Sequence, residues 1–304
     1  MEMSGWFKAL LTVTVPSVAL IAFTAAVING PPFEKNESKS AKLIRDFGTN
    51  FDIDVILPGE STPAFRLLAP EAIYGDGMEK VGGVHMRPAT WTESGDELEG
   101  TLKLGEAVEC ALRLKPTADG TLMRITIKNT SEDTYKDVRL DICANLCRLP
   151  RSHKVEWSNR DFIPESVPLD RTQHGKHWYS VVTPTKLKAW RPGKGWVIMH
   201  ERPDNPEPDP NNPYWRVVSE TDDSFGCAVM SQDGKKLFYQ VWRAERSHHQ
   251  SPFAGNACMH LKPQIAKTLA PGQVATIQGK AGIFEGTWEQ MAAEFEKFVQ
   301  VEEE

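Results

Sequence analysis

The chain has 304 residues, of which 40% are hydrophobic and 25% are charged, values typical of a globular protein with a hydrophobic core. Its formal net charge of −6 argues against a nucleic-acid-binding protein, which normally carries a basic stripe. The length fits one large all-β domain or two smaller domains.

The amino terminus predicts export from the cytoplasm. Lys8 precedes an apolar run over 9–28, and small residues at 24–26 offer a cleavage site near Ala26. Residues 1–28 are therefore expected to be a signal peptide. A retained membrane anchor is the alternative, because about 20 apolar residues can span a bilayer.

In both cases the rest of the chain is expected to be extracytoplasmic, whether periplasmic, secreted or membrane-anchored. Membrane contact is then expected only through the N-terminal segment, if it is uncleaved. Residues 29–44 are polar and contain two prolines, and they predict a flexible tether. Residues 45–304 are expected to form one main domain.

Short strands separated by turn residues are predicted from Phe51 onward. Polar and apolar residues alternate, the pattern of half-buried strands, over 51–57, 97–104, 106–114, 121–128 and 136–146. Many strands at a spacing of about eight to twelve residues are typical of a β-sandwich or barrel. The fold class predicted is all-β, as a large two-layer antiparallel sandwich with one C-terminal helix.

The region 150–216 is less regular and contains a proline-rich stretch, 203–213, which predicts an exposed loop. Long loops of this kind often line binding sites. Strands resume at 225–230 and 237–242, joined by a turn that predicts a hairpin. A final alternating pair is expected around 274–284.

The C-terminal helix is predicted from its first turn. Thr287 and Gln290 have the spacing of a capping box. Trp288, Met291 and Phe295 then fall on one helical face together with Phe298, so this face is expected to pack over the sandwich.

Five cysteines lack the spacing of a disulfide framework: Cys110, Cys143, Cys147, Cys227 and Cys258. Cys143 and Cys147 lie in one predicted strand, where four residues span roughly 13 Å, too far for a bridge. Buried free thiols are therefore expected, since a free cysteine behaves as a small hydrophobic residue.

Several segments carry a resemblance to a known family. They are the turn and long strand from Asn129 to Leu146, and the stretches 230–234, 241–242, 255–263, 269–272 and 284–286. Together they resemble galactose mutarotase-like β-supersandwich domains, in particular exported bacterial members, over most of residues 45–298. The resemblance implies two large antiparallel sheets packed face to face, with a sugar bound in a groove on one sheet.

The chain departs from this family at its catalytic positions. The resemblance implies a His-Pro pair as general acid after the central strand, but residues 145–150 read NLCRLP and contain no histidine. Near the family's glutamate base this chain has Cys258-Met259-His260. The family's acid/base pair is therefore not carried over, and no reaction is assigned.

His260 is the leading candidate for the site and for any catalytic role, because an imidazole can exchange a proton near neutral pH. The alternative is a histidine that is satisfied within the sheet. Asn256 could offer its amide to sugar hydroxyls, or it could form a turn. Trp242 could stack on a sugar ring, or it could be a core residue.

Three further polar residues are expected to line the groove: Asn145, Arg148 and His177. Neither a metal nor a cofactor is predicted. His174, His177, His200 and the pair at 248–249 are spread along the chain, and a metal site needs several ligands to converge.

The N-terminal segment and the resemblance together favour a secreted or periplasmic carbohydrate-binding protein of the mutarotase-like group, and they leave a sugar-processing activity open. Two alternatives stay open. One is a sugar epimerase or polysaccharide lyase-like enzyme that uses His260. The other is a non-catalytic structural or interaction protein of the cell envelope.

Overall fold

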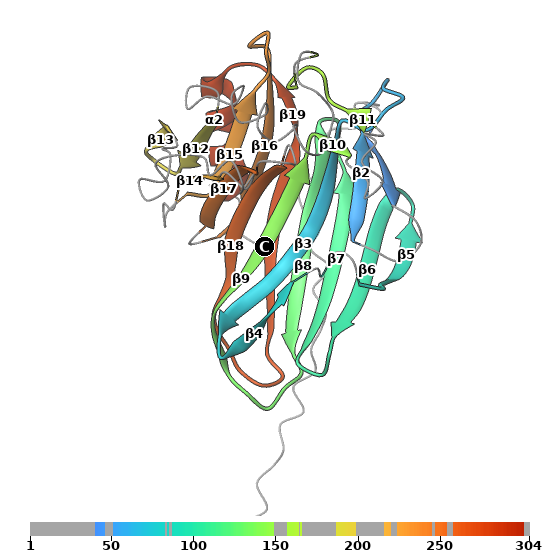
Figure 1. Cartoon of the computed structure of the whole chain (residues 1–304), viewed down its shortest axis with the longest axis vertical. Coiled ribbons are helices and arrows are strands. Elements are labelled where there is room, and N and C mark those ends of the chain that lie inside the picture. Colours follow the sequence, from blue (N-terminus) through green and yellow to red (C-terminus); the bar gives the residue numbers. More distant parts are fainter. Residues whose placement is uncertain are drawn as a thin grey trace, which may run out of the picture. The chain divides into compact units, whose positions relative to one another are not determined.

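Two large antiparallel β-sheets, a short two-stranded pair and a C-terminal helix are the regular elements of the described part of the chain (Figure 1). The structure is a computed structural model, and it describes residues 40–45, 51–82, 84, 87–148, 157–163, 165, 187–198, 216–219, 224–244, 247–253 and 258–300. All of them belong to one compact unit, Asn36–Glu302.

The first sheet has eight strands. They are β1 (Lys42–Arg45), β2 (Asp52–Ile56), β3 (Phe65–Asp76), β4 (Met78–Gly82), β9 (Tyr135–Asn145), β14 (Arg216–Ser219), β17 (Ser247–Phe253) and β18 (Cys258–Leu269). Their order is β1-β2-β3-β9-β18-β17-β14, with β4 paired to β3. The central strands β3, β9 and β18 are therefore neighbours, although they come from distant parts of the sequence.

The second sheet has nine strands in the order β13-β12-β15-β16-β19-β8-β7-β6-β5. They are β5 (Thr90–Ser94), β6 (Glu97–Leu104), β7 (Val108–Pro116), β8 (Gly120–Asn129), β12 (Leu187–Arg191), β13 (Gly195–Ile198), β15 (Gly226–Met230), β16 (Lys236–Trp242) and β19 (Val274–Glu285). A separate short pair joins β10 (Cys147–Arg148) to β11 (Trp157–Ser158).

The main core lies between the two sheets, and it follows from the alternation of the strand sequences. In β9, Val138, Leu140 and Ile142 are fully buried and belong to this core. In β7 of the nine-stranded sheet, Leu112 and Leu114 are also fully buried and belong to this core. Because successive strand residues point to opposite faces, the residues between them face away from the core.

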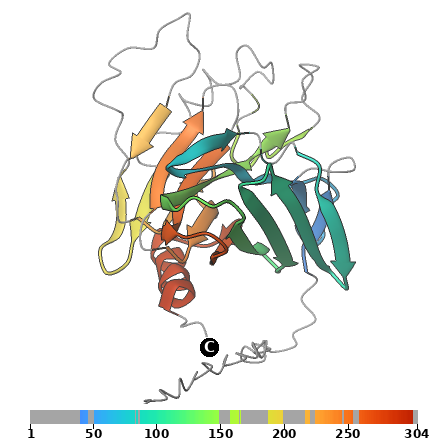
Figure 2. The ribbon, with the colours of Figure 1, turned by 90° about the horizontal axis from the view of Figure 1, so that it is seen from below.

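The helix α2 (Trp288–Gln300) covers part of the outer face of the nine-stranded sheet (Figure 2). Its buried residues Met291 and Phe295 pack against Trp190 of β12 and Tyr239 of β16. The backbone N–H of Thr287 donates to Gln290 Oε1 at 2.9 Å, and that of Gln290 donates to Thr287 Oγ1 at 3.4 Å. The predicted capping box and packing face are confirmed.

The predicted fold class is confirmed by this arrangement of two antiparallel layers with one C-terminal helix. Two details differ from the expectations. The last three residues of the expected tether, 42–44, form the edge strand β1 together with Arg45, and this strand pairs with β2. Residues 274–285 form one strand, β19, because it is hydrogen-bonded along its length to β8 and β16.

The cysteine prediction is confirmed for the four thiols that the structure describes. Cys110, Cys143, Cys147 and Cys227 are buried, and none of the four forms a disulfide. Burial raises the pKa of the Cys110 and Cys227 thiols, which keeps both protonated at neutral pH. In the described part of the chain, no helix is long and apolar enough to cross a membrane.

Candidate functional site

His260 lies in β18 on the face of the eight-stranded sheet that points away from the core. Its neighbours in the strand, Met259 and Leu261, are buried in the core between the sheets. The alternation of a β-strand therefore turns the imidazole to the opposite face. The residue is 3% exposed, so the ring is almost completely enclosed.

Two carboxylates lie close to the Nδ1 atom of His260. Asp141 Oδ1 is 2.9 Å away, at hydrogen-bond distance, and Glu71 Oε2 is 3.6 Å away. The side chain of Glu71 is 35% exposed and that of Asp141 is 15% exposed, against 4% for the histidine. Contact with solvent at this cluster is therefore made mainly through Glu71.

The position of Glu71 follows from an irregularity in β3. Leu68 pairs with Cys143, and the next paired residue, Ala72, is opposite Asp141. Strand β3 thus has extra residues between these two pairs, among them Pro70, which cannot donate a ladder hydrogen bond. This bulge carries Glu71 toward His260.

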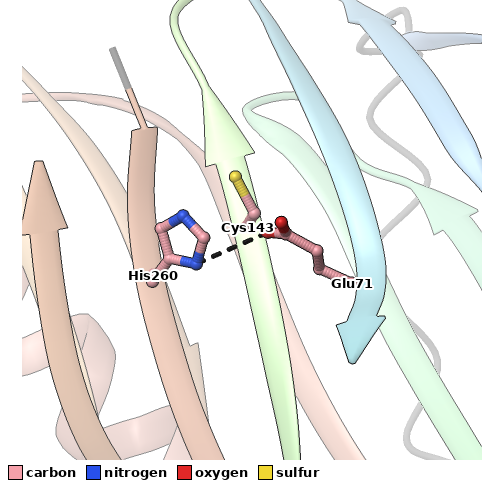
Figure 3. Close-up of side chains that lie close together, drawn as sticks. All are labelled: Glu71, Cys143 and His260. Atoms are coloured by element: carbon pink, nitrogen blue, oxygen red, sulfur yellow. Dashed lines mark ion pairs between the residues drawn. The ribbon is translucent and has the colours of Figure 1, made fainter. Parts of the chain in front are cut away.

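Cys143 and Asn145 continue the same face of β9. Cys143 is the register partner of His260, and its Sγ atom accepts a hydrogen bond from Asn145 Nδ2 at 3.4 Å. Figure 3 shows Glu71, Cys143 and His260 converging from β3, β9 and β18. The Asn145 Oδ1 atom is buried and accepts no hydrogen bond in the described part of the chain.

A buried ion pair borders this cluster. Arg66 of β3, the register partner of Asn145, donates from Nε to Asp54 Oδ1 at 2.8 Å and from an Nη atom to Asp54 Oδ2 at 3.3 Å. Asp52 lies 3.7 Å from the same guanidinium. The two-point geometry holds Arg66 rigidly beside the cluster.

Tyr74 and Arg139 form the next register pair along the face. Burial raises the pKa of the Tyr74 phenol, and the negative charge of Asp141 raises it further. Tyr74 is therefore a neutral hydroxyl at physiological pH. We call the set Glu71, Tyr74, Asp141, Cys143, Asn145 and His260 the polar face.

Trp242 does not lie on the polar face, and this corrects the expectation that it shares a groove with His260. It is fully buried in the core between the sheets, and its register partner is Gly279. An added Cβ at Gly279 would lie 2.5 Å from the indole ring. Trp242 extends from the nine-stranded sheet into the core, whereas His260 lies on the face of the eight-stranded sheet that points away from the core. Trp242 is therefore a core residue.

The other predicted site residues are placed as follows. Asn145 lies on the polar face, two positions from Cys143. Arg148 ends β10, where the structure describes its backbone only. Asn256 and His177 lie outside the described residues, as does the expected loop at 203–213.

Sequence reasoning missed Glu71 and Asp141. Asp141 is a charged residue within a strand that was predicted from alternation, and this pattern marks it only as facing away from the core. Glu71 follows Pro70 in a mainly apolar run, and only the bulge brings it to the histidine. Cys143 was expected solely as a buried thiol.

A cavity of about 1110 Å³ opens elsewhere in the described unit, and its lining includes Asp119, Asn159, Asp161 and Lys236. Three of its charged side chains, those of Lys236, Asp161 and Asp119, have partners of opposite charge. Lys236 donates to Asp161 at 2.6 Å, and Asp119 accepts from Lys280 at 2.8 Å. Of the residues predicted for the site, the three whose side chains the structure describes, Asn145, Trp242 and His260, do not line this cavity.

Comparisons with known proteins were made for the whole chain. No family model and no curated protein matches it. Solved structures similar to it include a galactose mutarotase-like protein from Lactobacillus casei, with 11% identity, a TM-score of 0.40, and coverage of 80% of this chain and 100% of that one.

A putative aldose 1-epimerase from Escherichia coli K12 has 10% identity and a TM-score of 0.41, covering 81% of this chain and 99% of that one. A polysaccharide lyase has 9% identity and a TM-score of 0.41, covering 86% of this chain and 34% of that one. The sequence motifs resemble galactose mutarotase-like proteins, and proteins of this kind are also among the solved structures similar to this chain.

Proposed function

We propose that the chain is an exported carbohydrate-binding protein whose ligand lies on the polar face. The observation that carries the proposal is the position of His260 Nδ1, 2.9 Å from Asp141 and 3.6 Å from Glu71. The inference that the ligand is a sugar comes from the sequence motifs that resemble mutarotase-like domains. The apolar segment at 9–28 supports export.

The polar face offers the groups that a polyhydroxylated ligand needs. A sugar hydroxyl is both a donor and an acceptor, so its binding site needs both kinds of group. The Glu71 carboxylate and the buried Asn145 Oδ1 atom are acceptors, and the Tyr74 hydroxyl is a donor. When a buried polar group has a hydrogen-bond partner only in the bound ligand, the site prefers a ligand with a hydroxyl group at that position over one without it.

The same geometry supports a second candidate function, a sugar-processing enzyme. An imidazole whose Nδ1–H is donated to a carboxylate is fixed in orientation and tautomer, and its Nε2 atom can then act as a base. His260 and Asp141 have this relationship. Glu71 would supply a second proton-transfer group from the more exposed side.

The test is a glycan array and a thermal-shift screen with the purified full chain, followed by titration of each sugar that responds. We expect at least one mono- or oligosaccharide to bind. Glu71→Gln removes one charge at a side chain that is already 35% exposed, so the variant should fold. It should weaken binding roughly tenfold, the cost of losing one charged hydrogen bond.

Asp161→Asn is the matched control, because Asp161 lies outside the polar face and pairs with Lys236 near the surface. This variant should bind like the wild type. If no sugar binds, or if Glu71→Gln and Asp161→Asn behave alike, the proposal is wrong and a scaffold role is favoured. Release of a converted sugar by the wild type but not by His260→Gln would establish the enzyme.

A further inference from the structure

The side chains of Glu71, Cys143 and His260 bring three different metal-binding groups together on the polar face (Figure 3). One donor atom of each lies within 4.8 Å of the donor atoms of the other two. They come from three adjacent central strands, β3, β9 and β18, which are hydrogen-bonded to one another. The spacing is therefore set by the sheet itself.

We propose that these three residues bind a zinc ion. A thiolate, an imidazole and a carboxylate are all regular ligands of Zn²⁺, and the thiolate disfavours Mg²⁺ and Ca²⁺, which prefer oxygen. Three protein ligands leave a fourth position open, as in zinc sites that act on a bound molecule. The open position would be reached from the side of Glu71, the most exposed of the three residues.

Asp141 supports this assignment because its carboxylate lies beside the Nδ1 atom of His260. Histidines that bind zinc commonly donate their other ring N–H to a carboxylate, which fixes the ring and strengthens the ligand. His260 Nδ1 lies 2.9 Å from Asp141 Oδ1 and 3.6 Å from Glu71 Oε2. With Asp141 on Nδ1, a zinc ion would be bound through Nε2, and the Glu71 side chain would have to swing from Nδ1 toward that side of the ring. Asp141 is thus a positioning residue for the proposed metal.

The site needs a small closure to bind the ion. Ligand atoms around a tetrahedral zinc lie about 3.5 Å apart, given the usual zinc–ligand bond lengths. A separation of up to 4.8 Å therefore has to shorten by about 1 Å. Glu71 can supply this movement, because it lies on a bulge and its side chain is partly exposed.

The proposal is independent of whether the ligand of the polar face is a sugar. The full chain is first treated with a chelator, which is then removed. It is then titrated with ZnCl₂ alone, and binding is measured by calorimetry. We expect one zinc ion per chain with micromolar or tighter affinity. Cys143→Ser and Glu71→Gln should each weaken binding roughly tenfold or more. Cys110→Ala, which removes a buried thiol from the other sheet, should leave binding unchanged.

Cobalt(II) gives a second readout that reports directly on the thiolate. A Co²⁺–thiolate bond produces a charge-transfer band in the near ultraviolet, which should appear with the wild type and with Cys110→Ala but not with Cys143→Ser. The absence of zinc binding to the folded chain would overturn the proposal. A cobalt band that survives in Cys143→Ser would do the same.

Sugar titrations with and without chelator separate the two proposals. If a sugar binds equally well in both conditions and zinc does not bind, the zinc site alone is wrong. If zinc binds as described and no sugar does, the carbohydrate proposal alone is wrong.

Discussion

The Nδ1 atom of His260 and the Oδ1 atom of Asp141 lie 2.9 Å apart, although 119 positions separate the two residues in the chain. The contact exists because β9 and β18 are antiparallel neighbours, with Cys143 opposite His260. Both side chains point away from the core, since the alternate residues of each strand are buried in it. The candidate site is therefore a product of strand pairing.

Replacing Asp141 with asparagine tests this contact. Asparagine keeps the shape and can still accept a hydrogen bond from Nδ1–H, but the charge is lost. A charged hydrogen bond is stronger than a neutral one by about 1 kcal/mol, so the unfolding free energy should fall by about that amount. Urea denaturation measures the change, and an unchanged unfolding free energy would show that this contact does not stabilise the fold.

Gly279→Ala should destabilise the protein. The added Cβ would lie 2.5 Å from two atoms of the Trp242 ring, which is fully buried and cannot move aside. Overpacking of this kind costs about 1–3 kcal/mol of unfolding free energy, measured by urea denaturation. In the double variant with Trp242→Leu the two effects should be less than additive. Full additivity would show that the methyl group and the indole do not meet.

Asp119 should make stability depend on pH in the acid range. Burial raises the pKa of Asp119, but Lys280, Tyr239 and Thr117 outweigh it by charge and hydrogen bonds, so the net pKa is lowered. A carboxyl group whose pKa is lowered by folding stabilises the folded state. This contribution is complete above the pKa of the unfolded state, about 4, and it is lost as the pH falls through the pKa of the folded state.

The unfolding free energies of wild type and Asp119→Asn should therefore differ more at pH 7 than at pH 3, as measured by urea denaturation. Asp96→Asn, at an exposed turn, is the control for the substitution itself. A difference for Asp119→Asn that is the same at both pH values would contradict the assignment.

Thr287→Ala should weaken the attachment of α2. The substitution removes the Oγ1 acceptor of the Gln290 N–H at the start of the helix. Loss of such a cap costs about 1 kcal/mol. Thermal denaturation monitored by circular dichroism measures the loss, and Thr287→Ser, which keeps the hydroxyl, should restore most of it. Equal melting of the alanine and serine variants would argue against the cap.

Elements whose signals are local could be predicted from the amino-acid sequence. Residues 97–104 alternate, and the structure has β6 over those residues. Thr287 and Gln290 marked the start of α2, and the turn before Leu237 marked the β15–β16 hairpin. These features depend on neighbouring residues and on which face is apolar, and both can be read along the chain.

Which polar residues meet could not be predicted, because it depends on how distant strands pair in the folded chain. An alternating strand shows that His260 or Asp141 faces away from its buried neighbours, but it does not show which strand lies beside it. Trp242 could not be placed for the same reason, because a tryptophan suits a sugar and a core equally well. The pairing of β3, β9 and β18, and the bulge at Glu71, are set by contacts between distant segments. Predicting the site requires those contacts, whereas predicting the fold class requires only the alternation within each strand.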